Sequence, residues 1–312
     1  MNSGIVVKST GSWYYVKSDK KIVKCKLKGK FKIKGLRSTN PIAVGDKVEF
    51  ILQKIDNIGL INKIKERKNF IARKSINLSR TSHIIAANID FVFLLVTLKM
   101  PKTYTKFIDR FLIAAEASNI KTVLVFNKID LYDEDEKEQL DKLESLYKSI
   151  GYKTAKISVT EKINLDTIKS FIKDKIILIS GNSGVGKSSL INELQPGLNL
   201  RTDEISEMHE QGKHTTTFAE MFEIAGGMII DTPGIKGFGI VNIPQEEISH
   251  YLPEMNKLRN QCKFNNCTHT HEPDCAVKKA VETGDISEIR YENYIGIFND
   301  YEEGKYREDA FR

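Results

Sequence analysis

Residues 180–189 read Ser-Gly-Asn-Ser-Gly-Val-Gly-Lys-Ser-Ser, and this stretch decides the fold. It fits the pattern G-x-x-x-x-G-K-S and lies between an apolar run, Ile176–Ile179, and a helix-like segment, Ser189–Leu194. A phosphate-binding loop requires this strand–loop–helix context. Its glycines let backbone N–H groups point at phosphate oxygens, and the helix N-terminus adds partial positive charge. We predict a phosphate loop made of Gly181, Asn182, Ser183, Gly184, Val185, Gly186, Lys187, Ser188 and Ser189.

Apolar strands alternate with helices upstream of this loop. Asp90–Val96 and Thr122–Phe126 have the composition of buried strands. Phe107–Ala117 has the apolar spacing of an amphipathic helix, and Asp133–Ser149 that of a charged surface helix. The pattern predicts an α/β domain in which helices cover a parallel sheet.

The second of these strands ends in a four-residue sequence, Asn127, Lys128, Ile129 and Asp130. The carboxylate of Asp130 can accept two hydrogen bonds from the N1–H and N2–H₂ groups of guanine, a donor pair that adenine lacks. The motif follows a predicted strand, and α/β sheets bind ligands at the carboxyl ends of their strands. Further on, Ser158 and Val159 form a loop that can offer a backbone N–H to guanine O6. We therefore predict that the nucleotide base is guanine.

Two more nucleotide-binding elements follow the phosphate loop. The threonines of Gly212–Thr217 can give a hydroxyl to Mg²⁺ and a backbone N–H to the γ-phosphate, as in a switch loop. In the D-x-x-G sequence, Asp231 is placed to bind the metal through water and Gly234 to contact the γ-phosphate. The resulting order is base, base, phosphate, switch, switch. Ordinary guanine-nucleotide switches begin with the phosphate loop, so this order predicts a circular permutation.

Phosphoryl transfer requires positioning and charge neutralisation. Lys187 is predicted to reach the terminal phosphates, and the Ser188 hydroxyl to ligate Mg²⁺. Ile235 stands where a water-positioning glutamine usually follows D-x-x-G, and its side chain cannot orient water. Our hypothesis is that His214, beside the switch threonines, takes this role, because a neutral imidazole can accept a hydrogen bond from water. The alternative is a solvated loop histidine.

The N-terminal segment is basic and rich in short β-type runs. Residues 1–70 contain 17 Lys and Arg against 5 Asp and Glu, although the whole chain has a net charge of only +7. Such segregation of charge is typical of a module that binds a polyanion. Short apolar runs separated by turn signals predict a small barrel between Gly4 and Ile64, followed by a linker or loop over Lys65–Arg80.

Lysines alternate with apolar residues and glycine in part of this segment, at the two-residue period of a strand. They are Lys24, Lys26, Lys28, Lys30, Lys32 and Lys34. We predict contact with an RNA or DNA backbone, although lysines on strands also prevent aggregation between strand edges. The aromatic side chains of Trp13, Tyr14 and Tyr15 can stack on bases or fill the barrel.

The C-terminal quarter combines predicted helices, Gln245–Leu258 and Asp274–Thr283, with a cluster of potential metal ligands. The cluster consists of Cys262, Cys267, His269 and Cys275. Three thiols and one imidazole form a closed tetrahedral shell, which is typical of structural zinc. His271 is an alternative to His269, and the alternative for the whole cluster is unlinked buried thiols.

Composition limits the location of the protein. The sequence has no run of 18 apolar residues, and its first residues lack the apolar core of a signal peptide. Four cysteines do not suggest a disulfide scaffold in a chain of 312 residues. We expect a cytoplasmic protein with no membrane partner, and a monomer.

Taken together, these residues resemble the RsgA family of small ribosomal subunit biogenesis GTPases. The resemblance rests on Val44-Gly45-Asp46, on the order NKID, GNSGVGKSS, GKHTTT, DTPG, and on CKFNNCTHTHEPDCAV. It implies an OB-fold barrel, a circularly permuted GTPase domain and a mostly helical zinc-binding domain. We expect these domains at residues 1–68, 69–240 and 241–312.

The resemblance also implies that the protein binds the small ribosomal subunit and its rRNA, and hydrolyses GTP to GDP and phosphate late in subunit maturation, stimulated by that particle. It favours His269 over His271 as the zinc ligand, and Thr216 as the Mg²⁺ ligand. The main alternative is an RNA-binding assembly factor in which guanine nucleotide is mainly structural. An ATPase is a third possibility, against which Asp130 argues.

Overall fold

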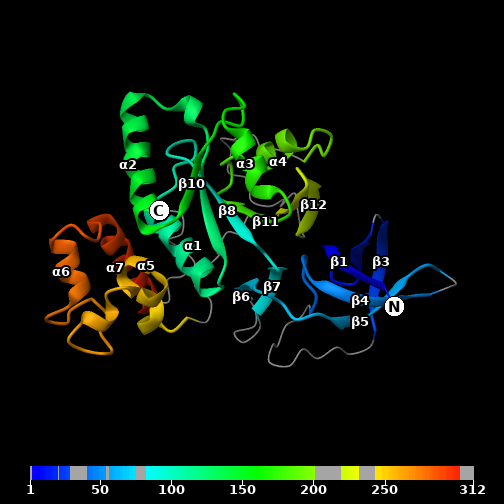
Figure 1. The fold of residues 1–312 in the computed structure, drawn as a ribbon, viewed down its shortest axis with the longest axis horizontal. Helices are drawn as coiled ribbons and strands as arrows, with labels where there is room; N and C mark the ends of the chain where they lie inside the picture. Colours follow the sequence, from blue (N-terminus) through cyan, green and yellow to red (C-terminus); the bar gives the residue numbers. More distant parts are fainter. Residues whose placement is uncertain are drawn as a thin grey trace.

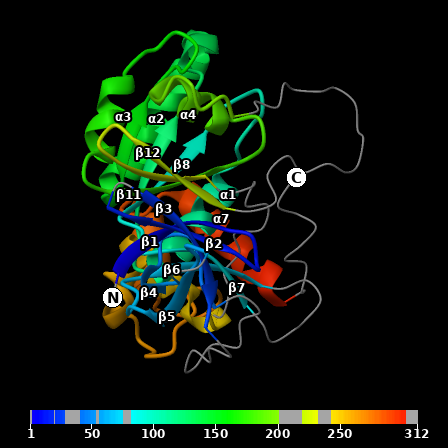
Figure 2. The same ribbon diagram turned by 90° about the vertical axis from the view of Figure 1, so that its right-hand side faces the viewer.

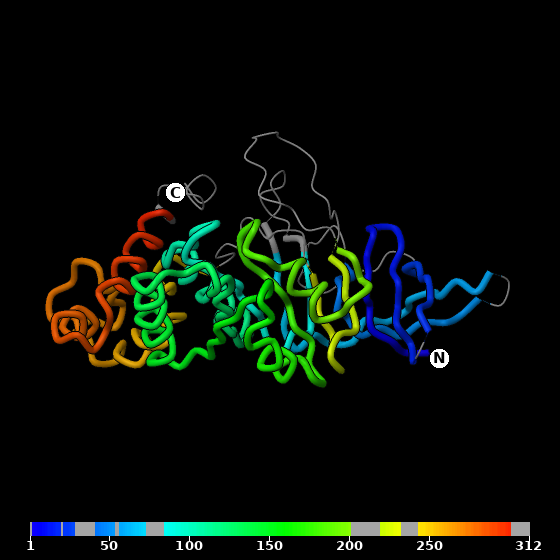
Figure 3. Tube along the Cα trace, turned by 90° about the horizontal axis from the view of Figure 1, so that it is seen from above, coloured from blue at the N-terminus to red at the C-terminus, as the bar shows by residue number. Residues whose placement is uncertain are grey.

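The computed structural model of this protein describes residues 2–19, 21–28, 41–53, 56–74, 82–200, 219–231 and 243–302. These residues form three groups that lie in a row, a barrel, an α/β domain and a group of C-terminal helices (Figure 1 and Figure 3). Within the described ranges, every helix is too short or too polar to span a membrane.

The N-terminal group is a closed five-stranded barrel, which lies toward the viewer in Figure 2. Its strands are β1 (Asn2–Ser9), β2 (Tyr14–Ser18), β3 (Lys21–Leu27), β4 (Lys47–Leu52) and β5 (Gly59–Ile64). They follow the order β1-β2-β3-β5-β4, and β4 pairs back onto β1, so the sheet closes. All neighbours are antiparallel except β3 and β5. The barrel is the expected OB-fold.

A hairpin joins the barrel to the α/β domain, and here the predicted linker over Lys65–Arg80 is partly wrong. Strand β6 (Phe70–Lys74) pairs antiparallel with β7 (Ser82–Ala87). Ile71 is fully buried, but it belongs to a run of only three apolar residues before Arg73 and Lys74. A run this short does not predict a strand by itself. Its partner strand lies beyond the basic stretch, so the pairing leaves no local signal in the sequence.

The α/β domain contributes six strands in the order β10-β9-β8-β11-β13-β12, and the sheet continues into the barrel where β12 pairs with β1 at Glu220 and Lys8. Its strands are β8 (Phe91–Val96), β9 (Lys121–Phe126), β10 (Lys153–Lys156), β11 (Ile176–Gly181), β12 (Glu220–Ile224) and β13 (Gly227–Asp231). Strand β12 is antiparallel to β13, and the other neighbours are parallel. The phosphate-loop strand β11 is central, with earlier strands of the chain on one side and later strands on the other. This is the predicted permuted arrangement.

Helices cover both faces of this sheet (Figure 1). Helices α1 (Thr105–Ala117) and α2 (Glu134–Ile150) share one apolar cluster with one face of the strands. Helices α3 (Leu165–Ile172) and α4 (Lys187–Leu194) share another with the opposite face. Successive residues of β8 alternate between the two clusters, so the buried strand serves both cores. The predicted strands of this domain are confirmed, and so is the charged surface helix over Asp133–Ser149. The amphipathic helix predicted over Phe107–Ala117 is confirmed as a helix, but α1 is buried at every position from Ile108 to Ala115, because α7 and η2 cover the side that faces away from the sheet.

The C-terminal group consists of helices, of which α7 and η2 pack on α1. They are η2 (Gln245–Tyr251), α5 (Pro253–Asn256), η3 (Arg259–Gln261), α6 (Ala276–Glu282) and α7 (Glu288–Glu302). The single helix predicted over Gln245–Leu258 is wrong, because it breaks into a 3₁₀ helix and a one-turn α-helix at Pro253. Proline lacks an N–H and restricts the residue before it, and Leu252 is extended. The helix predicted over Asp274–Thr283 is confirmed by α6.

Candidate nucleotide site and metal centre

The predicted phosphate loop lies between the end of β11 at Gly181 and the start of α4 at Lys187. The ammonium of Lys187 folds back over the loop and donates to the carbonyl oxygens of Gly181 at 3.0 Å and Asn182 at 2.6 Å. Ser188 and Ser189 lie in the first turn of α4, where backbone N–H groups lack helical partners. This arrangement presents N–H donors and one cation to the same point.

Two glycines of the loop are required by close contacts from the base-reading half of the domain. A Cβ on Gly181 would lie 2.5 Å from the carbonyl oxygen of Leu95, at a φ of +146°. A Cβ on Gly186 would lie 2.4 Å from Nδ2 of Asn127, at a φ of +99°. The loop therefore fits against β8 and Asn127 only when these positions have no side chain.

Asn127 connects three loops. Its side chain is 2% exposed, its Nδ2 donates to the carbonyl oxygen of Val185 at 2.8 Å, and its Oδ1 accepts from the N–H of Val159 at 3.3 Å. One amide thus joins the end of β9 to the phosphate loop and to the loop after β10. These segments are far apart in sequence, and they meet because parallel strands place their carboxyl ends at one edge of the sheet.

The remaining residues of the predicted guanine-binding motif, Lys128 to Asp130, turn away from the end of β9. They lie beside the loop that follows β10. Lys128 has a left-handed φ of 65°, and Ile129–Leu131 form the short 3₁₀ helix η1. The ammonium of Lys128 donates to the carbonyl oxygen of Met100, and burial lowers the pKa of Lys128. Asp130 is exposed, whereas Ser158 is fully buried. The exposed carboxylate of Asp130, beside the buried loop at Ser158, can therefore contact the edge of a bound base.

The structure reaches only part of the predicted switch region. Asp231 is the last residue of β13, and its backbone lies in register with Ile179 of β11, next to the phosphate loop. Predicted residues that lie outside the described part of the chain are His214, Thr216, Gly234, Ile235, Lys30, Lys32 and Lys34.

Sequence reasoning missed Tyr132 and the loop between β8 and α1. The hydroxyl of Tyr132 contacts backbone groups of Leu98 and Asn127, and Pro101 faces Gly184 of the phosphate loop. No motif marks these residues. The only signal was position, because the loop follows the carboxyl end of a predicted central strand.

The predicted metal ligands converge in the C-terminal group. The ligand atoms of Cys262, Cys267, His269 and Cys275 all lie within 4.8 Å of one another. Nδ1 of His269 is 3.6 Å from Sγ of Cys262 and 3.4 Å from Sγ of Cys275. With ideal bonds of about 2.3 Å to sulfur and 2.0–2.1 Å to nitrogen, a tetrahedral Zn²⁺ site has N···S edges of about 3.6 Å. The cluster fits such an ion, and it could hold a metal.

Only one of the two candidate histidines points into this cluster. His269 is 1% exposed, whereas His271 is exposed and its Nδ1 lies 2.9 Å from Oγ1 of Thr270. The loop that carries His269 is fixed by Glu272, which accepts from the N–H groups of Thr268 at 2.7 Å and Thr270 at 3.0 Å. Burial alone would raise the pKa of Glu272, but the hydrogen bonds outweigh it and lower the pKa to about 2.

Comparison with known proteins agrees with this architecture over nearly the whole chain. The family model for the RsgA N-terminal domain matches residues 3–61, and that for the RsgA GTPase matches residues 64–241. A small ribosomal subunit biogenesis GTPase RsgA 2 of Bacteroides thetaiotaomicron is 55% identical, over 97% of this chain and 98% of that protein. The counterpart in Flavobacterium psychrophilum is 53% identical, over 99% of this chain and 96% of that protein.

Two solved structures are similar in fold as well as in sequence. YjeQ from Thermotoga maritima is 38% identical with a TM-score of 0.79, covering 96% of this chain and 98% of that one. YloQ, described as a circularly permuted GTPase, is 29% identical with a TM-score of 0.74, covering 97% and 96%. The chain therefore belongs to the RsgA family of circularly permuted GTPases.

Proposed function

We propose that this protein is a GTPase of small ribosomal subunit biogenesis. It binds the subunit and its rRNA, hydrolyses GTP to GDP and phosphate late in maturation, and is stimulated by the subunit. The observation that carries the proposal is the side chain of Asn127, which contacts both Val185 and Val159. Relatives that are 53–55% identical carry the name of such a GTPase.

The predicted site residues have the following roles in this proposal. The phosphate loop holds the nucleotide phosphates, Lys187 neutralises their terminal charge, and Asp130 selects guanine. Asp231 contacts the metal through water, and Gly234 contacts the γ-phosphate. Mg²⁺, when bound, would be held by Ser188 and Thr216 and would neutralise charge that develops during phosphoryl transfer.

We further propose that His214 orients the attacking water. The proposal rests on the apolar side chain of Ile235 at the usual place of a glutamine, and on the neutrality of imidazole near pH 7. The variant His214→Ala is expected to keep nucleotide affinity and to lose most turnover. Unchanged turnover in that variant would contradict the role.

The outer domains supply contacts rather than chemistry. We propose that Cys262, Cys267, His269 and Cys275 hold one Zn²⁺, which would cross-link the C-terminal group as a structural ion. The barrel, residues 1–68, binds rRNA through its lysines, and the GTPase domain spans residues 69–240 and the zinc-binding domain residues 241–312. The protein acts as a cytoplasmic monomer.

One experiment tests the proposal against its alternatives. GTP and ATP turnover are measured with the purified protein, with and without purified small ribosomal subunits. GTP hydrolysis that rises severalfold with subunits is expected. Tight GTP binding without stimulated turnover would instead favour an RNA-binding factor with structural nucleotide. A preference for ATP would contradict the roles of Asp130 and of the whole base-reading motif.

A further inference from the structure

We propose that Tyr132 is a positioning residue for guanine-nucleotide binding, because its hydroxyl fixes the base-reading motif relative to the phosphate loop. The inference rests on the proposed function. Tyr132 directly follows η1 and is 4% exposed. Its Oη donates to the carbonyl oxygen of Asn127 at 2.8 Å and accepts from the N–H of Leu98 at 2.8 Å. One hydroxyl thus bridges the ends of β8 and β9.

The first of these bonds completes the support of Asn127. The N–H of Asn127 donates to the carbonyl oxygen of Val96 at 2.9 Å, and its side chain holds Val185 and Val159. With the bond from Tyr132, every polar group of Asn127 has a partner. The Tyr132 hydroxyl is therefore one of the four contacts that hold Asn127, at the start of the motif that continues through Asp130.

The second bond fixes the loop between β8 and α1 at its start. Further along this loop, the carbonyl oxygen of Met100 accepts from the ammonium of Lys128. The ring of Pro101 lies against Gly184, where an added Cβ would be 3.5 Å from Cδ of Pro101. The loop that Tyr132 holds thus contacts both the base-reading motif and the phosphate loop.

A hydroxyl is needed here for a reason other than packing. The ring of Tyr132 belongs to the apolar cluster under α1 and α2, and a phenylalanine would fill the same space. The phenol is protonated at neutral pH, as tyrosine ordinarily is, and burial raises the pKa of Tyr132 further to about 12, so the hydroxyl can both donate and accept. Without it, the carbonyl group of Asn127 and the N–H of Leu98 lose these partners, which is costly above all at the buried Asn127.

The test compares Tyr132→Phe with the matched control Tyr147→Phe. Tyr147 is also fully buried, and its hydroxyl donates to Asp109 at 2.7 Å, at the contact between α2 and α1. The dissociation constants of GDP and GTP, kcat and the melting temperature are measured for both variants and the wild type. Because Tyr132 supports the base-reading motif and not the γ-phosphate, we expect Tyr132→Phe to weaken GDP and GTP binding alike, by about tenfold, with kcat at saturation unchanged.

The control is expected to lower the melting temperature and to leave both dissociation constants unchanged. If Tyr132→Phe lowers the melting temperature as the control does but binds GDP like the wild type, its role is structural only and the inference is wrong. If wild-type protein does not bind GDP or GTP, the proposed function fails first, and the inference with it.

Discussion

Gly186 lies against the side-chain amide of Asn127, and this contact determines which residues the position tolerates. A Cβ there would lie 2.4 Å from Nδ2 of Asn127. The variant Gly186→Ala is expected to displace Asn127 from Val185 and to weaken GDP binding more than tenfold, as measured by titration. Gly197→Ala is the control, because Gly197 has a similar φ of +104° and nothing within 4 Å of an added Cβ.

Both glycine variants carry the cost of a left-handed residue, about 1–2 kcal/mol, so both are expected to lower the melting temperature. Only Gly186→Ala places a methyl group in the site. Equal GDP affinity in the two variants would contradict the role assigned to the contact with Asn127.

At the scale of residues, the sequence predicted those functional residues that are recognised by their side-chain type and by a known spacing. The phosphate loop and Asn127 belong to this class, since the type and the spacing of these residues are visible in the chain. The choice of His269 over His271 came instead from the resemblance to the RsgA family. Tyr132 does not belong to this class. Its hydroxyl acts on backbone groups of Leu98 and Asn127, and backbone groups carry no sequence signal.

At the scale of elements, strand β3 presents a basic face that supports the proposed contact with rRNA. Lys24 and Lys26 are exposed on either side of the buried Cys25, as the alternation predicted. Their ammonium groups lie 4.0 and 4.3 Å from the centre of the ring of Trp13. The ring therefore holds two cations together on the barrel surface. Tyr14, in contrast, is buried in the barrel, so it is a core residue.

We expect the double variant Lys24→Gln, Lys26→Gln to weaken binding to small-subunit rRNA and to reduce the slope of log affinity against log salt by about 2. The control is Lys137→Gln, Lys142→Gln, two exposed lysines of α2 in the GTPase domain. Filter binding at several salt concentrations measures both slopes. A slope equal to that of the wild type would exclude β3 from the RNA contact.

The metal cluster predicts a matched pair of histidine variants. His269→Ala removes a buried ligand atom from the cluster, so we expect loss of bound zinc and a lower melting temperature. His271→Ala removes an exposed ring outside the cluster, and it is expected to keep one zinc per chain. Metal analysis and thermal unfolding, with and without a chelator, measure the two effects. Zinc loss in His271→Ala alone would reverse the assignment.

Elements whose signal is local were predicted well, and those that depend on distant partners were not. Helix α2 carries its own capping box from Asp133 to Glu136, and its charged face is visible in the sequence. Strand β6 exists only because β7 pairs with it across the basic stretch. Pro253 is visible in the sequence, but the helix-forming residues on both sides of it led to the prediction of one continuous helix.

At the scale of the whole molecule, α1 belongs to two domains. It begins at Thr105, directly after the loop that contacts the phosphate loop at Gly184. One face of α1 packs in the core of the α/β domain. The opposite face packs on α7, and Ile113 belongs to the apolar core of the C-terminal group. The C-terminal group, which carries the predicted metal ligands, is therefore attached to a helix that starts beside the predicted phosphate loop. The sequence could not predict this attachment, because Asp109 and Arg290, whose ion pair makes it, are separated by 181 residues.

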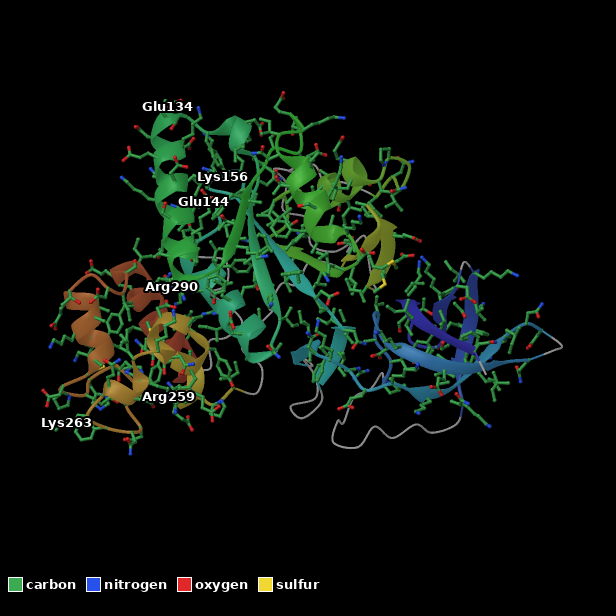
Figure 4. All side chains as sticks on the ribbon, in the orientation of Figure 1. Glu134, Glu144, Lys156, Arg259, Lys263 and Arg290 are labelled. Atoms are coloured by element: carbon green, nitrogen blue, oxygen red, sulfur yellow. The ribbon has the colours of Figure 1, made fainter. Side chains whose placement is uncertain are left out.

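Arg290 of α7 is the centre of this attachment (Figure 4). Its side chain is fully buried, its Nη1 donates to Asp109 of α1, and its Nε donates to Glu254 of α5 at 2.7 Å. Arg290→Met leaves the buried carboxylate of Asp109 and the partly buried carboxylate of Glu254 without their cation, which is expected to destabilise the protein by about 3–5 kcal/mol in urea unfolding. Lys169→Met, taken from the exposed pair with Asp166 on α3, is expected to unfold like the wild type.

The double variant Arg290→Met, Asp109→Asn separates the buried charge from the packing of α7. Removing a cation and an anion together relieves most of the uncompensated charge, so we expect it to recover part of the stability lost in Arg290→Met. If the double variant unfolds as early as Arg290→Met, the loss comes from packing around the arginine rather than from charge. In that case α7 would be held on α1 by its apolar face, and the ion pair would not determine how firmly the C-terminal group is joined to the α/β domain.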